Sequence, residues 1–168
     1  MSAHLPESVD AWRMVSARRS FAGSVAVAGM DRLVELLASR VGTVDYQLDF
    51  GRDALGTGYL DVHASANVEL LCQRTLEPFV ATLVVDQRLG LIGDESEEAA
   101  LPAEYEPLRI DGPLVLKDVI EDELLLAIPL VPMRPGSEEV LAPWQAQAEA
   151  PAAEVPHPFA KLKNLKQD

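Results

Sequence analysis

The chain has 168 residues, a net charge of −13 at pH 7 and 48% hydrophobic residues, which suffices for the core of one domain. This charge opposes general electrostatic binding to nucleic acid, because such binding depends on lysines and arginines that neutralise phosphates. No apolar run approaches the roughly 18 residues of a membrane span, so we expect no membrane association. The single cysteine, Cys72, excludes an internal disulfide framework, and with no signal-peptide pattern at the start it favours the cytoplasm.

Before residue 44 the sequence predicts two short helices around one strand. An extended segment and then a helix occupy the first 20 residues, with Pro6 and Ser8 as start signals. Phe21–Gly29 favours a strand. Met30–Arg40 has apolar residues at helical spacing, and Asp31 is placed to cap that helix.

From residue 44 onward the hydrophobic pattern has the two-residue period of strands. Val44–Phe50 alternates between apolar and polar residues, and a turn is predicted at Gly51–Gly58. Apolar residues occupy every even position of residues 60–72, which indicates one long strand or two strands joined at a bulge. Most odd positions of residues 79–91 are apolar, which predicts another long strand.

The next part of the sequence predicts an acidic loop, a short strand and a helix. The loop is Gly93–Glu104, the strand is Tyr105–Ile110, and the helix is Leu116–Ala127, which ends before Pro129. These elements together predict an α+β fold. It would consist of an antiparallel β-meander of about five strands, with two to three helices packed on one side or end.

Composition divides the chain into three parts. Residues 1–133 are predicted to form the single α+β domain, and residues 134–158 a flexible linker rich in alanine and proline. Residues 159–168 form a short, basic, amphipathic C-terminal motif that is too short to fold alone. In this motif we expect five residues to bind a partner: Phe159, Lys161, Leu162, Leu165 and Lys166.

No arrangement in the sequence indicates catalysis or a bound metal. A tetrahedral zinc site needs about four Cys or His ligands, whereas Cys72 stands alone and His4, His63 and His157 are scattered. Strand alternation places His63 on the outer face and Cys72 on the inner face, so the two are not expected to form a catalytic pair. We therefore expect a non-enzymatic protein without cofactor or small-molecule substrate, in which Cys72 is a small buried hydrophobe.

Acidic residues concentrate between Asp94 and Glu123, a segment with a net charge of −9. In the helix of residues 116–127, Glu123 falls near the centre of the apolar face, whereas Glu121 and Asp122 lie outside it. A carboxylate in an apolar stripe must be paired, neutralised or turned toward a partner. We predict an ion pair between Glu123 and Arg74; the alternative is that both side chains are solvated at the ends of their elements.

Several segments of the sequence, taken together, match the motifs of one protein family. They are Cys72–Arg74, Leu76–Phe79, Leu101–Pro107, Val119–Pro132 and the tail His157–Lys166. Together these segments resemble the YceD family, which is also called large ribosomal RNA subunit accumulation protein. The run IEDELLLAIPLVP with an upstream Cys-x-Arg is the more specific part. The resemblance marks as motif residues Cys72, Arg74, Glu121, Asp122, Glu123, Pro129 and Pro132.

The resemblance implies a non-catalytic bacterial ribosome biogenesis factor that supports synthesis, processing or accumulation of large-subunit (23S) ribosomal RNA by binding. Its partners would be the pre-ribosomal particle or ribosomal proteins, with ribosomal RNA contacted directly or indirectly. Many relatives carry Cys-x-Arg-Cys and a later His and Cys that resemble a zinc site, but this sequence departs from that pattern at three of the four places. Thr75 stands for the second Cys, Arg134 occupies the region of the His, and no Cys follows through Val140, so no zinc site is expected. The alternative is an acidic, protein-binding adaptor or a chaperone-like module with no ribosomal role.

Overall fold

The computed structural model describes residues 5–137 of the chain. Two compact units divide the whole chain, Met1–Met133 and Arg134–Asp168, and the described helices and strands belong to the first unit. The five residues of the C-terminal motif lie outside the described residues. The boundaries of the linker and of that motif stay predictions.

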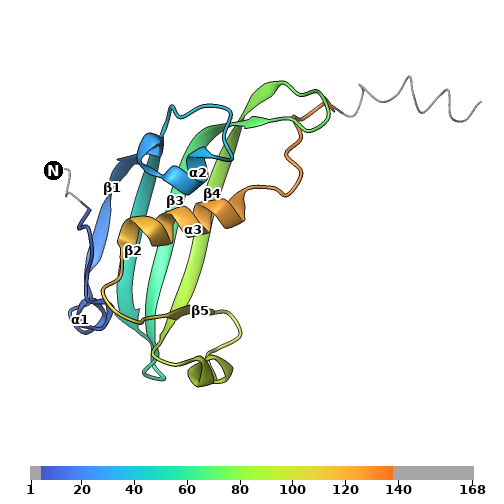
Figure 1. Cartoon of the computed structure of the whole chain (residues 1–168). Coiled ribbons are helices and arrows are strands. Elements are labelled where there is room, and N and C mark those ends of the chain that lie inside the picture. Colours follow the sequence, from blue (N-terminus) through green and yellow to red (C-terminus); the bar gives the residue numbers. More distant parts are fainter. Residues whose placement is uncertain (1–4, 138–168) are drawn as a thin grey trace, which may run out of the picture. The chain divides into compact units, whose positions relative to one another are not determined.

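The first unit is a five-stranded sheet with helices on one face (Figure 1). In chain order its elements are α1 (Ala11–Ser16), β1 (Ser20–Ala26), the 3-10 turn η1 (Val27–Gly29), α2 (Asp31–Val34), β2 (Thr43–Arg52), β3 (Gly58–Leu71), β4 (Pro78–Ile92), the 3-10 segment η2 (Glu95–Ala100), β5 (Glu106–Arg109) and α3 (Leu116–Ala127). The strands lie side by side in the order in which they occur in the sequence. The predicted α+β class with five strands is therefore confirmed.

The sheet is mixed, so the prediction of a purely antiparallel meander is wrong. Strands β1 to β4 pair antiparallel, whereas β5 pairs parallel to β4, with Leu89 opposite Glu106. A parallel neighbour requires a crossover connection instead of a tight hairpin. Residues 93–105, which include η2, supply that crossover, and the sequence pattern showed only that this segment was an acidic loop.

Both short N-terminal helices differ from their predicted starts or lengths. Asp10, not Pro6 or Ser8, caps α1, because its carboxylate accepts a hydrogen bond from the N–H of Arg13 (3.0 Å). The predicted helix Met30–Arg40 is reduced to the four residues of α2, and no side chain caps its start. After α2 the chain continues in turns, with the N–H of Leu36 donating to the carbonyl of Leu33 (3.0 Å), and the N–H of Ala38 then donates to the carbonyl of Glu69 (2.8 Å).

β3 is one continuous strand of 14 residues, which excludes the alternative of two strands joined at a bulge. Its even residues, from Leu60 to Leu70, are buried against the helices, and its odd residues face away from them. Cys72 follows directly and is fully buried, as predicted for a small hydrophobe. His63 lies on the opposite face, half exposed, which also confirms the alternation.

The hydrophobic core fills the space between the sheet and the helices α2 and α3, which lie across its front face in Figure 1. Its largest fully buried side chains include Met30, Leu33, Leu48, Leu60, Leu70, Leu116, Ile120 and Leu124. The bounds of α3 agree with the predicted helix, which ends two residues before Pro129. No helix in residues 5–137 is long and apolar enough to cross a membrane. The other face of the sheet mixes charged side chains such as Asp61 and Arg88 with the exposed apolar Val80 and Val84.

Candidate functional site

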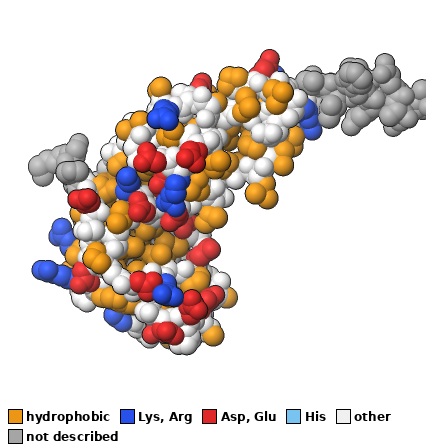
Figure 2. Space-filling view, in the orientation of Figure 1, with side chains coloured by type: hydrophobic (Ala, Val, Ile, Leu, Met, Phe, Trp, Pro, Cys, Tyr) orange, Lys and Arg blue, Asp and Glu red, His pale blue; other side chains and the backbone are white. Residues whose placement is uncertain are grey.

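A buried carboxylate joins α2 to α3. Glu121 on α3 is only 3% exposed, and its Oε1 accepts hydrogen bonds from the backbone N–H groups of Arg32 (2.8 Å) and Leu33 (2.9 Å). The guanidinium of Arg32 also lies 3.3 Å from the second carboxylate oxygen of Glu121, and 2.5 Å from Oδ1 of Asp122. The interleaved acidic and basic side chains over these two helices are visible in Figure 2. Glu121 thus supplies acceptors to amides at the start of α2 that the short helix leaves unsatisfied.

The sequence pattern placed Glu121 outside the apolar face of its helix, and the structure buries it there all the same. The projection assumes that burial follows the apolar stripe, whereas α2 covers the flank of α3 and buries a polar residue there. The donors that satisfy Glu121 are backbone amides 88 and 89 residues away in the sequence. Neither hydrophobic period nor charge spacing reports backbone amides, so no signal in the sequence identifies this contact.

Glu123 has a different environment two residues later. In the described part of the chain no ion pair joins it to Arg74, so the predicted pair is not formed. Glu123 is partly buried, and this desolvation, followed by the nearby charges of Glu106 and Asp122, raises its pKa above the ordinary value. The carboxylate is therefore one that the fold disfavours in its charged form, not one held by a cation.

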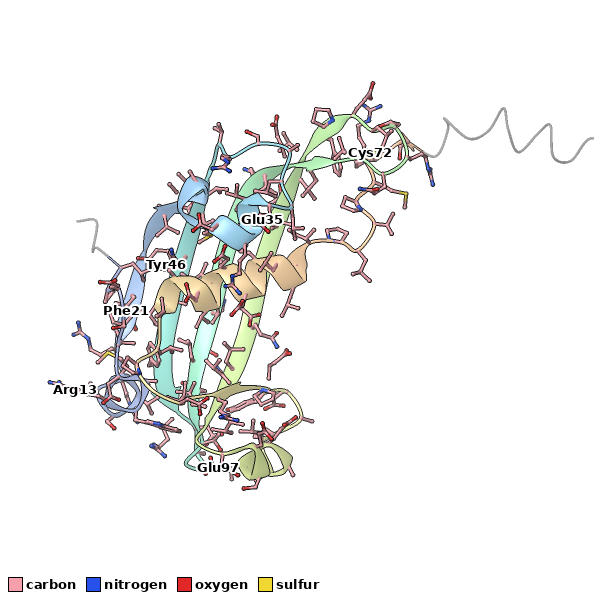
Figure 3. The ribbon with its side chains drawn as sticks, viewed as in Figure 1. Arg13, Phe21, Glu35, Tyr46, Cys72 and Glu97 are labelled. Atoms are coloured by element: carbon pink, nitrogen blue, oxygen red, sulfur yellow. The ribbon has the colours of Figure 1, made fainter. Side chains whose placement is uncertain are left out.

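The connection between β3 and β4 brings two motif segments together. After Cys72 the chain turns tightly, with Leu76 at φ 58° and its N–H donated to the carbonyl of Cys72 (2.8 Å). The N–H of the next residue, Gln73, donates to the carbonyl of Pro132 (2.9 Å). The Cys-x-Arg segment and the Pro-x-x-Pro segment are thus adjacent, and Figure 3 shows Cys72 at the end of the unit away from Arg13 and Glu97.

Several large apolar side chains are exposed at this end of the unit, and we call this group the tip patch. The tip patch consists of Leu71, Leu76, Val80, Leu130, Val131 and Met133, which are between 41% and 102% exposed. Figure 2 shows hydrophobic side chains gathered at this end of the molecule. Single exposed apolar residues are common, whereas a group of them at one end is a candidate interaction site.

The same corner does not fit a metal ion. Within residues 5–137 no group of three or more His, Cys, Asp or Glu side chains could hold one. Thr75, which stands where a second cysteine would complete a Cys-x-x-Cys pair, has a buried hydroxyl without a hydrogen-bond partner in the described structure. A threonine hydroxyl is a poor zinc ligand compared with a thiolate, so packing must hold this corner together.

The face of the sheet that points away from α2 and α3, which we call the open face, carries several ion pairs. Arg88 on β4 forms two hydrogen bonds to the carboxylate of Asp61 on β3 (2.6 and 2.7 Å) and lies 4.4 Å from the ring centre of Tyr59. Next to this pair, Nδ1 of His63 lies 3.0 Å from Oδ1 of Asp86. Shallow hollows along this face are lined by acidic, amide and hydroxyl side chains together with His63, Arg88 and Val84.

Sequence comparison identifies the family of the chain. Residues 60–166 match the family described as large ribosomal RNA subunit accumulation protein YceD. This chain belongs to the YceD family. A protein of that name from Haemophilus influenzae is 33% identical over 168 residues, which cover 97% of each chain. No solved structure matches the chain.

The YceD motif residues fall into two regions of the structure. Glu121 and Asp122 belong to the contact between α2 and α3, whereas Pro129 and Pro132 border the tip patch. Cys72 is a buried residue next to Leu71 of the tip patch. Arg74 lies in the same turn, partly buried. The structure thus brings Cys72 and Pro132 together, but it does not bring Arg74 to Glu123.

Proposed function

We propose that this chain is a non-catalytic cytoplasmic factor that supports the synthesis, processing or accumulation of large-subunit ribosomal RNA by binding a protein of the pre-ribosomal particle. Membership of the YceD family supports the ribosomal role, since the name of the family and of its Haemophilus influenzae member describes accumulation of that RNA. What the relatives' name leaves open is how a chain with a charge of −13 takes part in RNA metabolism.

The single structural observation that carries the binding role is the tip patch. It is built from the β3–β4 connection with the adjoining strand ends and from the loop after α3, and both regions carry family motifs. Leu130 is fully exposed, and Val131 and Met133 are about half exposed, although nothing in the core requires them there. Exposed apolar side chains grouped at one end of the unit favour docking of a protein partner.

Charge also favours a protein partner over bare RNA. Nucleic-acid affinity grows with the number of phosphates that basic side chains neutralise, and an acidic chain neutralises few. Ribosomal proteins, which are basic because they bind RNA, would be attracted by the same negative charge. We therefore propose that RNA is reached through such a protein.

Deletion of the gene in its host tests this function. We expect the amount of large-subunit RNA, precursor and mature together, to fall relative to small-subunit RNA, and a plasmid copy of the gene to restore it. Northern blots and sucrose gradients measure both quantities. An unchanged ratio of the two RNAs in a clean deletion would refute the ribosomal role. Recovery of partners unrelated to ribosomes in a pulldown at moderate salt would then favour the adaptor alternative.

A further inference from the structure

The outer edge of β1 has the properties of a strand-docking site. We propose that this edge binds an extended segment of a partner protein that carries two lysine or arginine side chains four residues apart. This inference rests on the proposed role in binding a basic protein partner, and it adds where and in which conformation such a partner would bind. It concerns a different surface from the tip patch.

The backbone register shows which groups of β1 are available. The N–H of Phe50 donates to the carbonyl of Arg19 (2.9 Å), and the N–H of Val27 donates to the carbonyl of Gly42 (3.0 Å). Hydrogen-bonded pairs alternate along antiparallel strands, so the intervening odd residues of β1 also direct their backbone groups toward β2. The backbone groups of the even residues therefore point away from the sheet.

These even residues are Ser20, Ala22, Ser24 and Ala26, and all four are exposed. β1 is the first strand of the sheet order, and none of residues 5–137 pairs with its outer side. The outermost strand at the left of Figure 1 is β1. A row of unpaired N–H and C=O groups at a sheet edge is a template for one more strand.

The two edges of the sheet differ in how they are protected. β5, at the far edge, has only four residues, among them Pro107 and the charged Glu106 and Arg109. Short length, proline and charge are the usual means by which proteins block an edge. β1 has seven residues with no proline and no charged side chain. It therefore lacks these protections along its whole length.

The open face next to this edge adds a preference for cations. Ser20 lies opposite Asp49, and Ser24 lies opposite Asp45, with their side chains on the open face. The hydroxyl of Ser24 donates to Oδ1 of Asp45 (2.6 Å), and hydrogen bonds, first from Ser20 and then from Gln47, lower the pKa of Asp49. Both carboxylates are thus one strand inward from the edge, and the hydrogen bonds to Asp49 favour its ionised form.

The distances suit long basic side chains. A docked strand would lie about 10 Å from β2, which is two strand spacings. Lysine and arginine are long enough to cross a serine and approach a carboxylate from the next strand, whereas short side chains are not. Between the two serines, Ala22 lies opposite the neutral Gln47, so the middle position needs no charge. Cations opposite Ser20 and Ser24 are four residues apart, on one face of an extended segment.

Titration of the purified full-length protein with a short peptide tests this inference. The peptide alternates threonine and valine and carries two lysines four residues apart; its control carries glutamates at the same places. We expect NMR shifts at the amides of Ser20, Ala22, Ser24 and Ala26 and at least about tenfold tighter binding of the lysine peptide, which is about 1.4 kcal/mol. Equal binding of both peptides, no binding, or shifts confined to another surface would overturn the proposal.

Two sets of variants separate the backbone from the charges. Ala22→Pro removes an outward N–H that the β1–β2 ladder does not use, and should abolish binding, whereas Ala22→Ser keeps the donor and should bind normally. The double change Asp45→Asn and Asp49→Asn should leave the two peptides bound equally. If it keeps the lysine preference, the charge argument is wrong, even where the proline variant fails to fold.

Sedimentation of the protein without peptide tests whether a second copy of the chain occupies the edge of β1 instead. A monomer is expected, and a dimer that Ala22→Pro dissociates would assign the edge to a second copy and overturn the proposal. These readouts are binding and mass in purified protein, whereas the proposed function is tested by RNA levels in cells. Each can therefore fail while the other holds.

Discussion

The sequence motif that spans α3 and the following loop has a buried first half and an exposed second half. In the first half, Glu121 is buried and holds backbone amides of α2, and Leu124 is fully buried in the core. In the second half, Leu130 and Val131 are exposed at the tip patch. One continuous sequence motif thus divides at the end of α3 into a part that holds the fold and a part that presents surface.

The difference shows that a shared motif is not by itself a site. Glu121 and Asp122 are acidic residues in an acidic segment, and sequence reasoning counted them with the functional residues. Their contacts with Arg32 explain them as links between two helices. No internal contact explains the exposure of Leu130, so the tip patch is where function is to be sought.

The largest effect among the polar contacts should come from Glu121. Glu121→Ala leaves two amides, those of Arg32 and Leu33, without their acceptor, and should lower the free energy of unfolding by about 3 kcal/mol. Glu121→Gln retains one acceptor oxygen and should cost less. Urea unfolding measures both. If the alanine variant is as stable as the glutamine variant, the link between α2 and α3 does not hold the fold.

Replacement of Glu123, unlike that of Glu121, should raise the stability of the protein, and only above acidic pH. Because its pKa is raised in the fold, the protonated form contributes stability that is complete below the unfolded pKa of about 4.3 and is lost as pH rises through the folded pKa. The Glu123→Gln variant should therefore be slightly more stable than the wild type at pH 7, and the two proteins should be equally stable near pH 4. Urea midpoints across this range measure the effect. Glu98→Gln, an exposed acid of η2, controls for the loss of one charge, and an identical pH response would contradict the account.

The tip patch should tolerate changes that the core does not. Leu130→Asp combined with Val131→Asp should change the free energy of unfolding by less than about 0.5 kcal/mol, because both side chains are already solvated. Leu124→Ala, in the same motif but fully buried, should cost about 3 kcal/mol. Thermal unfolding compares the two. A large loss in the double aspartate variant would mean that the tip residues hold the fold.

The smallest effect is expected from removal of metal. Since the described corner around Cys72 holds no cluster of three ligands, dialysis against EDTA should leave the urea midpoint unchanged. The control is the same dialysis followed by zinc addition. A midpoint that falls with EDTA and returns with zinc would show that a metal stabilises this fold after all.

The sequence predicted what local periodicity determines. The unbroken alternation from Leu60 to Leu70 identified β3, and Pro129 marked the end of α3 correctly. It could not predict the parallel pairing of β5, because pairing direction depends on the path of the crossover. It also missed the role of Glu121, whose partners are backbone amides from a distant segment. The sequence also did not predict the exposure of Leu130, because an apolar residue after a helix is usually expected to be part of the core.

The central claim is that the tip patch carries the ribosomal role, and cells that lack the gene test it most directly. They would receive a plasmid encoding the wild type, the Leu130→Asp and Val131→Asp variant, or Val41→Asp, a change at an 81% exposed residue outside the tip patch. At equal protein levels, we predict that the tip variant leaves the ratio of large- to small-subunit RNA as low as in the deletion, while Val41→Asp restores it. Full restoration by the tip variant would contradict the account.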